Sequence, residues 1–277
     1  MSTGLMILGA VFAGALLEGV ALHFLLPMLQ ETGAVRQNYQ GSDIPVSAGI
    51  SFPLVAIGVF ALYVPLAYFK SSYYPFLLGI TALCFLGFID DMLGQRDALG
   101  FKGHFGALFK GKLTTGGLKA LGGGMIAFFL ALLQPTGWVD LLVNTMLMAL
   151  FTNMLNLLDL RPGRAIKGYL FFLIAIIALA GARVDWLIIA PLLGAVICYF
   201  GIDLKARAMM GDAGSNVLGL ALGYISVISL TLPYRTGILL FLIILHIYTE
   251  KYSLTRTIEK YPWLRAVDNL GRGQSDG

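Results

Sequence analysis

Adjacent or regularly spaced polar residues end several of the long apolar runs of the chain. Asp90 and Asp91 stand side by side, and two neighbouring carboxylates repel each other, which favours a divalent cation, a cationic substrate group or a raised pKa on one of them. Asn153, Asn156 and Asp159 recur every three residues, so they lie roughly along one helix face. A solvated helix end is the alternative for the aspartate pair, and hydrogen bonds between helices are the alternative for the two asparagines.

A glycine-rich segment carries the next acid. Gly211, Asp212, Gly214 and Ser215 lead into another apolar run. Glycines around an acid at a helix start suit a tight turn whose free backbone N–H groups bind phosphate while the carboxylate holds Mg²⁺. An ordinary N-cap aspartate is the alternative for Asp212. The segment is not a P-loop, because no lysine follows the second glycine.

A histidine and a glutamate stand one helical turn apart near the end of the last apolar run. His246 and Glu250 share a helix face, and a purely local pair is the alternative. Carboxylates that hold a metal, together with the lysines and arginines in the same connections, are the side chains that phosphoryl transfer requires.

The composition indicates which elements must position these groups. Hydrophobic residues make up 58% of the 277 residues and charged residues only 12%, whereas charged residues form about 25% of a soluble domain. The apolar runs have the length of membrane-spanning helices and lack the alternation of barrel strands. Two cysteines, both within apolar runs, provide neither a disulfide framework nor a CxxC metal site. We therefore predict an all-α, polytopic membrane protein.

About nine transmembrane helices are expected in a single helical bundle over residues 1–250, followed by a cytoplasmic or interfacial tail over residues 251–277. Glu18, in the middle of the first span, should face the bundle, because a charge exposed to lipid costs about 2.5 to 3.5 kcal/mol. The candidate spans cover roughly 4–29, 46–69, 74–90, 117–133, 138–157, 166–180, 185–201, 214–231 and 236–249.

The basic residues predict the orientation of this bundle. Sixteen of the 19 lysines and arginines fall in the breaks after spans one, three, five, seven and nine. The positive-inside rule then puts the N-terminus outside and the C-terminus in the cytoplasm. We expect a multi-pass protein of the plasma (inner) membrane whose polar motifs all face the cytoplasm.

Taken in order, the motifs resemble those of the polyprenyl-phosphate N-acetylhexosamine-1-phosphate transferases, which include phospho-N-acetylmuramoyl-pentapeptide transferase and the GlcNAc-1-phosphate transferases. Residues 36–49 look like the first inner loop of that family, and residues 87–91 look like its paired-aspartate signature. Residues 153–159 look like its segment of two asparagines and an aspartate. Residues 207–215 give the most specific of the four matches.

The resemblance implies a transferase that moves the sugar-1-phosphate of a UDP-N-acetylhexosamine to polyprenyl (undecaprenyl) phosphate and releases UMP, in cell-wall or surface-glycan synthesis. It implies that Asp212 holds Mg²⁺ (or Mn²⁺) and that Asp90 and Asp91 orient or deprotonate the lipid phosphate. Lys112 matches the family's lysine after the paired aspartates. The resemblance further implies that Asp159, as a third catalytic residue, lines the nucleotide-sugar site. The implied substrate contacts are Asn153, Asn156, Lys112, Arg207, Gly211, Gly214, Ser215, His246 and Glu250.

Two departures from the family pattern leave an alternative open. Pro162 stands where the family has an aspartate or asparagine, and its late histidine cluster is reduced to His246 and Glu250. A catalytically inactive relative that binds lipid phosphate or nucleotide sugar as a regulatory or assembly partner would fit these departures. In an active enzyme, Arg161 and Arg164 beside Pro162 are predicted to bind phosphate or an acidic sugar substituent. We expect no nucleic-acid partner, and the sequence leaves a homodimer open.

Overall fold

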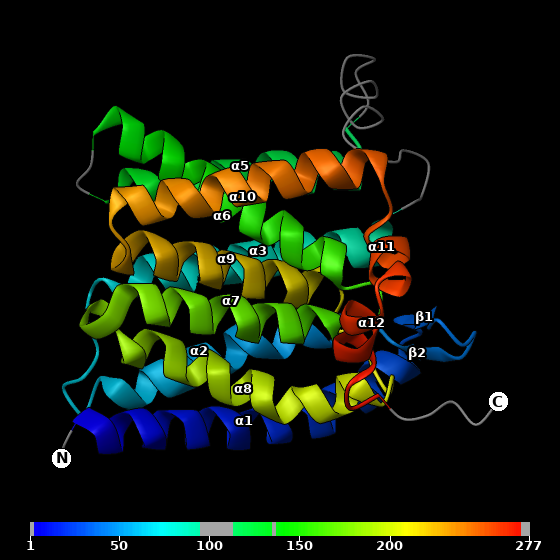
Figure 1. Cartoon of the computed structure of the whole chain (residues 1–277). Helices are drawn as coiled ribbons and strands as arrows, with labels where there is room; N and C mark the ends of the chain where they lie inside the picture. The colour runs from blue at the N-terminus through cyan, green and yellow to red at the C-terminus, as the bar shows by residue number, and fades with distance from the viewer. Residues whose placement is uncertain (1–2, 95–112, 135–136, 273–277) are drawn as a thin grey trace.

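Long helices run side by side through a computed structural model that describes residues 3–94, 113–134 and 137–272 (Figure 1). The long helices are α1 (Thr3–Glu31), α3 (Tyr73–Leu93), α5 (Thr115–Leu132), α6 (Trp138–Leu158), α7 (Arg164–Ala180), α8 (Trp186–Leu204), α9 (Gly211–Ser229) and α10 (Leu232–Lys251). The shorter elements are the antiparallel strands β1 (Val35–Gln37) and β2 (Asp43–Pro45), the 3-10 helices η1 (Ala48–Ile50) and η2 (Gly181–Arg183), and the helices α2 (Ser51–Tyr63), α11 (Leu254–Lys260) and α12 (Pro262–Asn269). The prediction of an all-α polytopic membrane protein is confirmed.

The nine expected spans correspond to α1, α2, α3 and α5 through α10. Two of these helices, α2 and α9, lack the length or the apolar composition of a membrane span. Seven helices in the described part of the chain are long and apolar enough to cross a membrane, and α2 and α9 are not among them. The second span is a short 3-10 turn followed by a helix of 13 residues that ends at Tyr63, well before residue 69. The small β1–β2 hairpin ahead of it has no counterpart among the sequence predictions.

Helix α9 forms the core of the bundle. Every residue from Ala213 to Val227 is buried, and glycine, serine and asparagine are among them. Its polar and small residues are acceptable because neighbouring helices, rather than lipid, cover all its sides. Contact with α6 is especially close, since a Cβ atom added at Gly219 would lie 2.4 Å from the Cα atom of Thr152.

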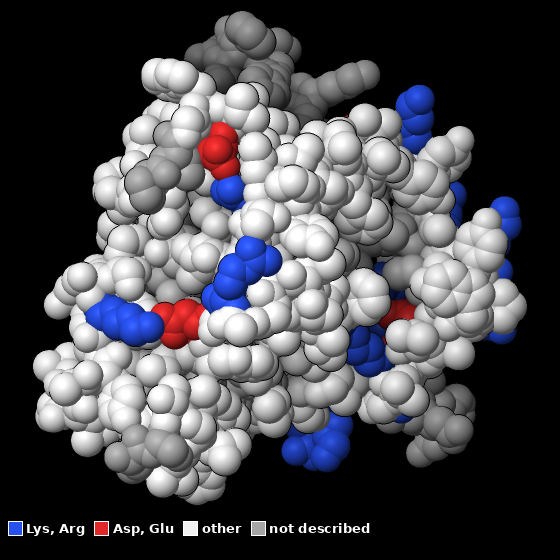
Figure 2. Space-filling model, turned by 60° about the vertical axis from the view of Figure 1, so that its left-hand side comes forward, with Lys and Arg blue, Asp and Glu red and all other residues white. Residues whose placement is uncertain are grey.

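The two ends of the bundle differ in polarity. The tail end carries β1, β2, the starts of α7 and α9, and helices α11 and α12, while the N-terminus lies at the opposite end (Figure 1). Figure 2, in which the opposite end is turned toward the viewer, shows a largely uncharged surface with a few acidic and basic side chains next to each other. Two ion pairs there are Lys70 with Asp185 at 2.7 Å and Arg235 with Asp140 at 2.6 Å.

Glu18 faces the interior of the bundle, as the sequence predicts. Its side chain is fully buried, and the Ser51 hydroxyl donates a hydrogen bond of 2.6 Å to Glu18 Oε1. The contact joins α1 to the start of α2. A carboxyl group in the middle of a membrane helix is therefore shielded from lipid and partly satisfied.

The close approach of α9 and α6 makes Gly219 a sensitive position. We expect Gly219→Val to lower stability by about 3 kcal/mol or to prevent folding, because the added carbons overlap the α6 backbone. Thermal unfolding of the purified protein in detergent measures the effect. Gly124→Val on α5 is the matched control, since a Cβ atom there has no neighbour within 4 Å. Equal unfolding temperatures for the two variants would contradict this account of the core.

Candidate functional site

A lysine joins two of the predicted acidic groups at the tail end of the bundle. Lys119 Nζ, near the start of α5, lies 2.7 Å from Asp90 Oδ2 near the end of α3. The same ammonium group contacts Asp212 Oδ2 at the start of α9. The three side chains are each about one-fifth exposed, at 21%, 17% and 21% for Lys119, Asp90 and Asp212. The sequence patterns therefore identified two carboxylates that meet in space, but they missed the cation between them.

Asn156 at the end of α6 completes this group. With its amide oriented so that both ends are satisfied, Asn156 Nδ2 donates to Asp212 Oδ1 at 2.9 Å and Asn156 Oδ1 accepts from Lys119 Nζ at 2.9 Å. Four helices, α3, α5, α6 and α9, thus each contribute one residue. We call Asp90, Lys119, Asn156 and Asp212 the polar cluster.

The sequence predicted a different lysine, Lys112, which lies outside the described residues. A usable signal for Lys119 was present in the sequence. It is the single charged residue in a long run of apolar and glycine residues, and a charge in such a run usually has a partner inside the bundle.

The two adjacent aspartates have different surroundings. Asp91 is buried, and its carboxylate accepts hydrogen bonds from the Ser47 hydroxyl at 2.6 Å and from the backbone N–H groups of Asp212 at 3.0 Å and Ala213 at 3.2 Å. Arg36 donates to the backbone carbonyl of Asp91. Free N–H groups at a helix start favour a carboxylate, so Asp91 fixes the start of α9.

Glycines allow the backbones to meet at this point. Gly211 has φ +68°, and a Cβ atom there would lie 2.3 Å from Asp91 Oδ2. A Cβ atom on Gly49 would lie 2.1 Å from the Cα atom of Gly214. The first predicted loop motif, which includes Gly49, therefore packs directly on the glycine-rich motif at the start of α9. Ser215, one turn into α9, is fully buried, and its hydroxyl has no hydrogen-bond partner among the described residues.

Asp159 follows the last residue of α6 and lies close to other acidic groups. Burial, followed by the negative charges of Asp203, Asp212 and Asp91, raises its pKa well above the usual value. A nearby cation would stabilise the ionised form of this carboxyl group. Asn153, two turns earlier on α6, is half-buried and makes no side-chain hydrogen bond to any residue that the structure describes.

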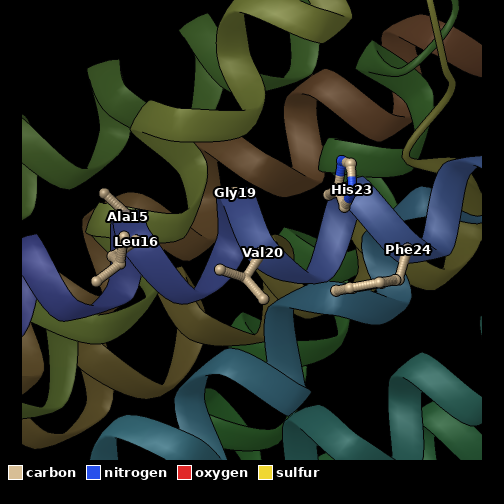
Figure 3. A pocket seen from close by; sticks show the side chains of 6 residues that line it. All are labelled: Ala15, Leu16, Gly19, Val20, His23 and Phe24. Carbon is tan, nitrogen blue, oxygen red and sulfur yellow. The ribbon is translucent and has the colours of Figure 1, made fainter.

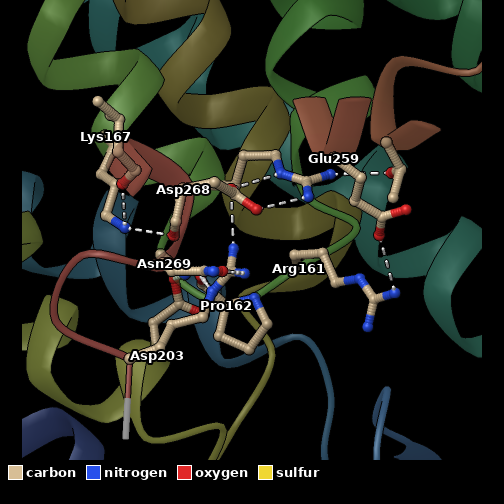
Figure 4. Close-up of polar contacts among 12 residues, drawn as sticks. Arg161, Pro162, Lys167, Asp203, Glu259, Asp268 and Asn269 are labelled. Carbon is tan, nitrogen blue, oxygen red and sulfur yellow. Dashed lines mark hydrogen bonds and ion pairs between the residues drawn. The ribbon is translucent and has the colours of Figure 1, made fainter. Parts of the chain in front are cut away.

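The two arginines beside Pro162 are in different environments (Figure 4). Arg164 is 5% exposed; its Nε and Nη2 atoms donate to the two carboxylate oxygens of Asp268, both at 2.8 Å, and Nη1 donates to Thr255 Oγ1 at 2.9 Å. The predicted phosphate contact of Arg164 is not favoured by this geometry, because all three nitrogens are already engaged by the tail. Arg161 is one-third exposed, with Nη2 3.8 Å from Glu259 Oε1 and the guanidinium over the Tyr39 ring.

Further contacts attach the tail to the α6–α7 loop and to the start of α7. Arg272 Nε donates to the Pro162 carbonyl at 2.8 Å, and Arg272 Nη2 donates to Asp268 Oδ1 at 2.8 Å. Lys167 Nζ donates to the Asp268 carbonyl at 2.7 Å (Figure 4). Burial alone would raise the pKa of Asp268, but the hydrogen bonds from Arg164 and Arg272 hold it below its usual value.

The remaining predicted residues, Arg207, His246 and Glu250, make no side-chain contact with the polar cluster in the described part of the chain. Arg207 is exposed, and no hydrogen bond or ion pair to another described residue engages its side chain. His246 Nδ1 contacts the Leu242 carbonyl at 2.7 Å, while Nε2 is buried without a partner among the described residues, and Glu250 is exposed. Helices α6 and α10 run in the same direction, with Arg235 bonded to Asp140 at one end. Counting along both helices from that pair places His246 level with the turn that carries Asn153.

Two open hollows lie away from this site, on the lipid-facing surface. One, of about 330 Å³, follows the outward side of α1 and includes Ala15, Gly19 and His23 (Figure 3). The other, of about 550 Å³, lies against α2, α3 and α5 and is lined by apolar residues such as Tyr74 and Phe129. Neither contains a residue of the polar cluster.

The contacts of Asp268 predict how the tail responds to mutation and pH. We expect Asp268→Asn to release the tail at a cost of about 3 kcal/mol, because Arg164 would remain buried without its carboxylate. The lowered pKa of Asp268 means that its stabilising effect is present above the usual value of 3.8 and is lost as the pH falls below it.

Trypsin cleavage at Arg256, Lys260 and Arg265 reports release of the tail. Glu259→Gln serves as the control, since Glu259 is exposed and its contact with Arg161 is long at 3.8 Å. Cleavage of Asp268→Asn at the wild-type rate would show that the buried pair does not hold the tail.

A comparison with known families identifies the family of the chain. Residues 73–230 match the model of the family described as glycosyl transferase family 4. No curated protein matches the chain. The matched region extends from the start of α3 beyond the end of α9, covers more than half of the chain and contains all four residues of the polar cluster. The chain therefore belongs to glycosyl transferase family 4, whose members transfer a sugar phosphate to polyprenyl phosphate, in agreement with the resemblance of its motifs.

Proposed function

We propose that the protein transfers an N-acetylhexosamine-1-phosphate from a UDP-sugar to polyprenyl (undecaprenyl) phosphate and releases UMP, in the synthesis of a lipid intermediate for cell-wall or surface glycans. The observation that carries the proposal is the meeting of Asp90, Lys119, Asn156 and Asp212 at one end of a membrane bundle. This cluster combines oxygen ligands for a hard cation with an ammonium group that can bind phosphate.

In the proposed reaction an oxygen of the lipid phosphate attacks the β-phosphorus of the UDP-sugar. The bond from that phosphorus to the bridging oxygen breaks, and UMP leaves with the bridging oxygen and its electrons. Asp90 orients the lipid phosphate or accepts its proton, and Lys119 binds a phosphate oxygen. The protein contributes mainly positioning and charge neutralisation, since phosphoryl transfer needs little covalent help.

The donor set fits a divalent cation such as Mg²⁺ or Mn²⁺. The Oδ2 atoms of Asp90 and Asp212 both contact the ammonium group of Lys119, so two carboxylates from facing helices share one position for positive charge. A divalent ion would take this position when Lys119 turns to a phosphate oxygen of the substrate. Asp212 would hold the ion, with Asp90 and the Asn156 carbonyl next to it. A bound ion would neutralise charge on the diphosphate. The described residues contain no group of three acidic, histidine or cysteine side chains poised to hold a metal, and waters and substrate phosphates commonly supply the other ligands of Mg²⁺.

Other residues are proposed to act around this centre. Asp91 positions the start of α9 rather than contacting substrate, because donors occupy both of its carboxylate oxygens. Asp159 and Asn153 line the nucleotide-sugar side of the cluster, and Arg161 and Arg207 are available for a diphosphate or an acidic substituent. The other proposed substrate contacts are Lys112, Gly211, Gly214, Ser215, His246 and Glu250.

We propose that the tail end faces the cytoplasm and that the protein lies in the plasma (inner) membrane. The excess of lysine and arginine in the connections at the tail end supports this orientation. The opposite end has few basic residues, and two of them, Lys70 and Arg235, are paired with aspartates.

An inactive relative that binds nucleotide sugar or lipid phosphate is the second candidate. Pro162 favours it, because this position supplies a backbone carbonyl to Arg272 and no polar side chain to a substrate. The intact polar cluster favours the enzyme. An assay with UDP-sugars, undecaprenyl phosphate and Mg²⁺ separates the two, since only the enzyme releases UMP.

Loss of the cluster should abolish activity without unfolding the protein. We expect Asp212→Asn and Lys119→Gln each to reduce UMP release by about 100-fold or more, because each removes a charge needed at the diphosphate. The thermal unfolding temperature should change little in Asp212→Asn, since the amide is isosteric. Asp185→Asn, at the opposite end, is the control and should retain activity. Full activity of Asp212→Asn would contradict the metal assignment.

The two arginines of the α6–α7 loop should behave differently. Arg161→Ala is expected to raise the KM for the nucleotide sugar by about tenfold, on the order of 1.4 kcal/mol, with little change in stability. Arg164→Ala should mainly release the tail, because it leaves Asp268 with one arginine partner fewer. Steady-state kinetics and trypsin cleavage of both variants test the contrast, and an unchanged KM in Arg161→Ala would remove this residue from the site.

Cysteine labelling tests the orientation. In a background with Cys84→Ala and Cys198→Ala, Lys70→Cys should react with a membrane-impermeant maleimide on intact cells. Lys205→Cys should react only after the cells are permeabilised, because it lies at the tail end. The reverse pattern would place the polar cluster on the outside.

A further inference from the structure

The last helix of the chain turns its apolar side away from the protein. On α12, Trp263 is 67% exposed and Val267 is 56% exposed, and Leu270 just after the helix is 70% exposed. Their spacing of four and three residues puts them on one face. Asp268, on the opposite face, is 8% exposed and is held by arginines of the bundle and tail. On a soluble domain, by contrast, an amphipathic helix packs its apolar face on the protein and turns its polar face to the solvent.

The position of α12 relates this apolar face to the membrane. Lys167 Nζ, one turn into α7, donates to the carbonyls of Val267 at 3.0 Å and Asp268 at 2.7 Å. Phe171 and Ile174 follow Lys167 on the same face of α7, and both are about two-thirds exposed, at 67% and 66%. The lipid-facing stripe of a membrane helix thus leads directly to α12, which lies at the end of α7 in Figure 1.

The charges around α12 indicate the chemistry of the surface that covers it. Arg256, Lys260 and Arg265 are exposed, and Lys260 Nζ lies 5.8 Å from the centre of the Tyr261 ring. Tyr261 is itself 45% exposed and directly precedes α12. Exposed basic side chains beside exposed tryptophan and tyrosine are typical of segments that lie at an anionic membrane surface.

We propose that α12 inserts the face formed by Trp263, Val267 and Leu270 into the boundary between headgroups and acyl chains of an anionic phospholipid leaflet. The positive charges of Lys260 and Arg265 would then be attracted to the anionic headgroups. The buried pair of Arg164 and Asp268 holds the opposite face of the helix on the bundle. Lipid on one side and the ion pair on the other would together keep the tail on the loop that follows Asp159.

Tryptophan fluorescence of the full chain in nanodiscs tests the proposal, because both membrane faces are accessible there. The chain has three tryptophans, so Trp138→Phe with Trp186→Phe leaves Trp263 as the sole emitter. In discs that contain phosphatidylglycerol, we expect lipids brominated near the headgroup end of the chain to quench Trp263. Acrylamide should quench it about twofold less than in discs of phosphatidylcholine alone.

Matched variants separate the apolar and the electrostatic contributions to the contact between α12 and the lipid. Val267→Gln with Leu270→Gln should abolish quenching by brominated lipid, and Lys260→Gln with Arg265→Gln should abolish the difference between the two kinds of disc. These positions are exposed, so the fold should be retained. A chain with Trp138 as its only tryptophan is the positive control for quenching by brominated lipid. Trp138 is 87% exposed and lies at the opposite end of the bundle, where the lipid can reach it.

Two results would overturn the proposal. The tail is solvated if acrylamide quenches Trp263 equally in both discs and brominated lipid has no effect. A protein surface, such as a second copy of the chain, covers α12 if Trp263 is protected from acrylamide in both discs without any quenching by brominated lipid.

Discussion

The carboxylate of Asp91 holds the start of α9 against the end of α3, and the geometry of the whole site depends on this contact. Two backbone N–H groups of α9 and the Ser47 hydroxyl donate to it in a buried position. The free N–H groups of a helix start carry partial positive charge, so a buried carboxylate is stable there. Asp90 precedes Asp91 in the chain, and Asp212 supplies one of the N–H donors, so the contact sets the separation of these two cluster residues.

Close backbone contact makes this arrangement possible. A Cβ atom at Gly87 would lie 2.3 Å from the Asp212 carbonyl oxygen, and one at Gly49 would lie 2.1 Å from the Gly214 Cα atom. Without side chains at these points, α3, α9 and the first loop meet at one place. Because α2, α3, α6 and α7 pack around α9, it can carry polar residues that a lipid-facing helix could not.

Two clusters at the tail end of the bundle combine opposite charges in a similar way. The polar cluster places one ammonium group between two carboxylates, and the tail places one carboxylate between two guanidinium groups. Both arrangements are partly or fully buried, and both stay near a helix end, where desolvation costs less than at the centre of the bilayer. The same end thus contains the candidate catalytic groups and the contacts that fix the loop beside them.

The sequence by itself determined the membrane fold and most of the acidic site, whereas the tertiary structure decided which cations accompany it. Long apolar runs specify helices directly, and Asp90, Asn156 and Asp212 lie in short motifs whose spacing is local. Lys119 belongs to no such motif, so only the folded bundle brings it to the two aspartates. Arg164 looked available for phosphate because its partner Asp268 is 104 residues away. Local patterns record periodicity along one helix, and they carry no information about which distant charge will neutralise a buried group.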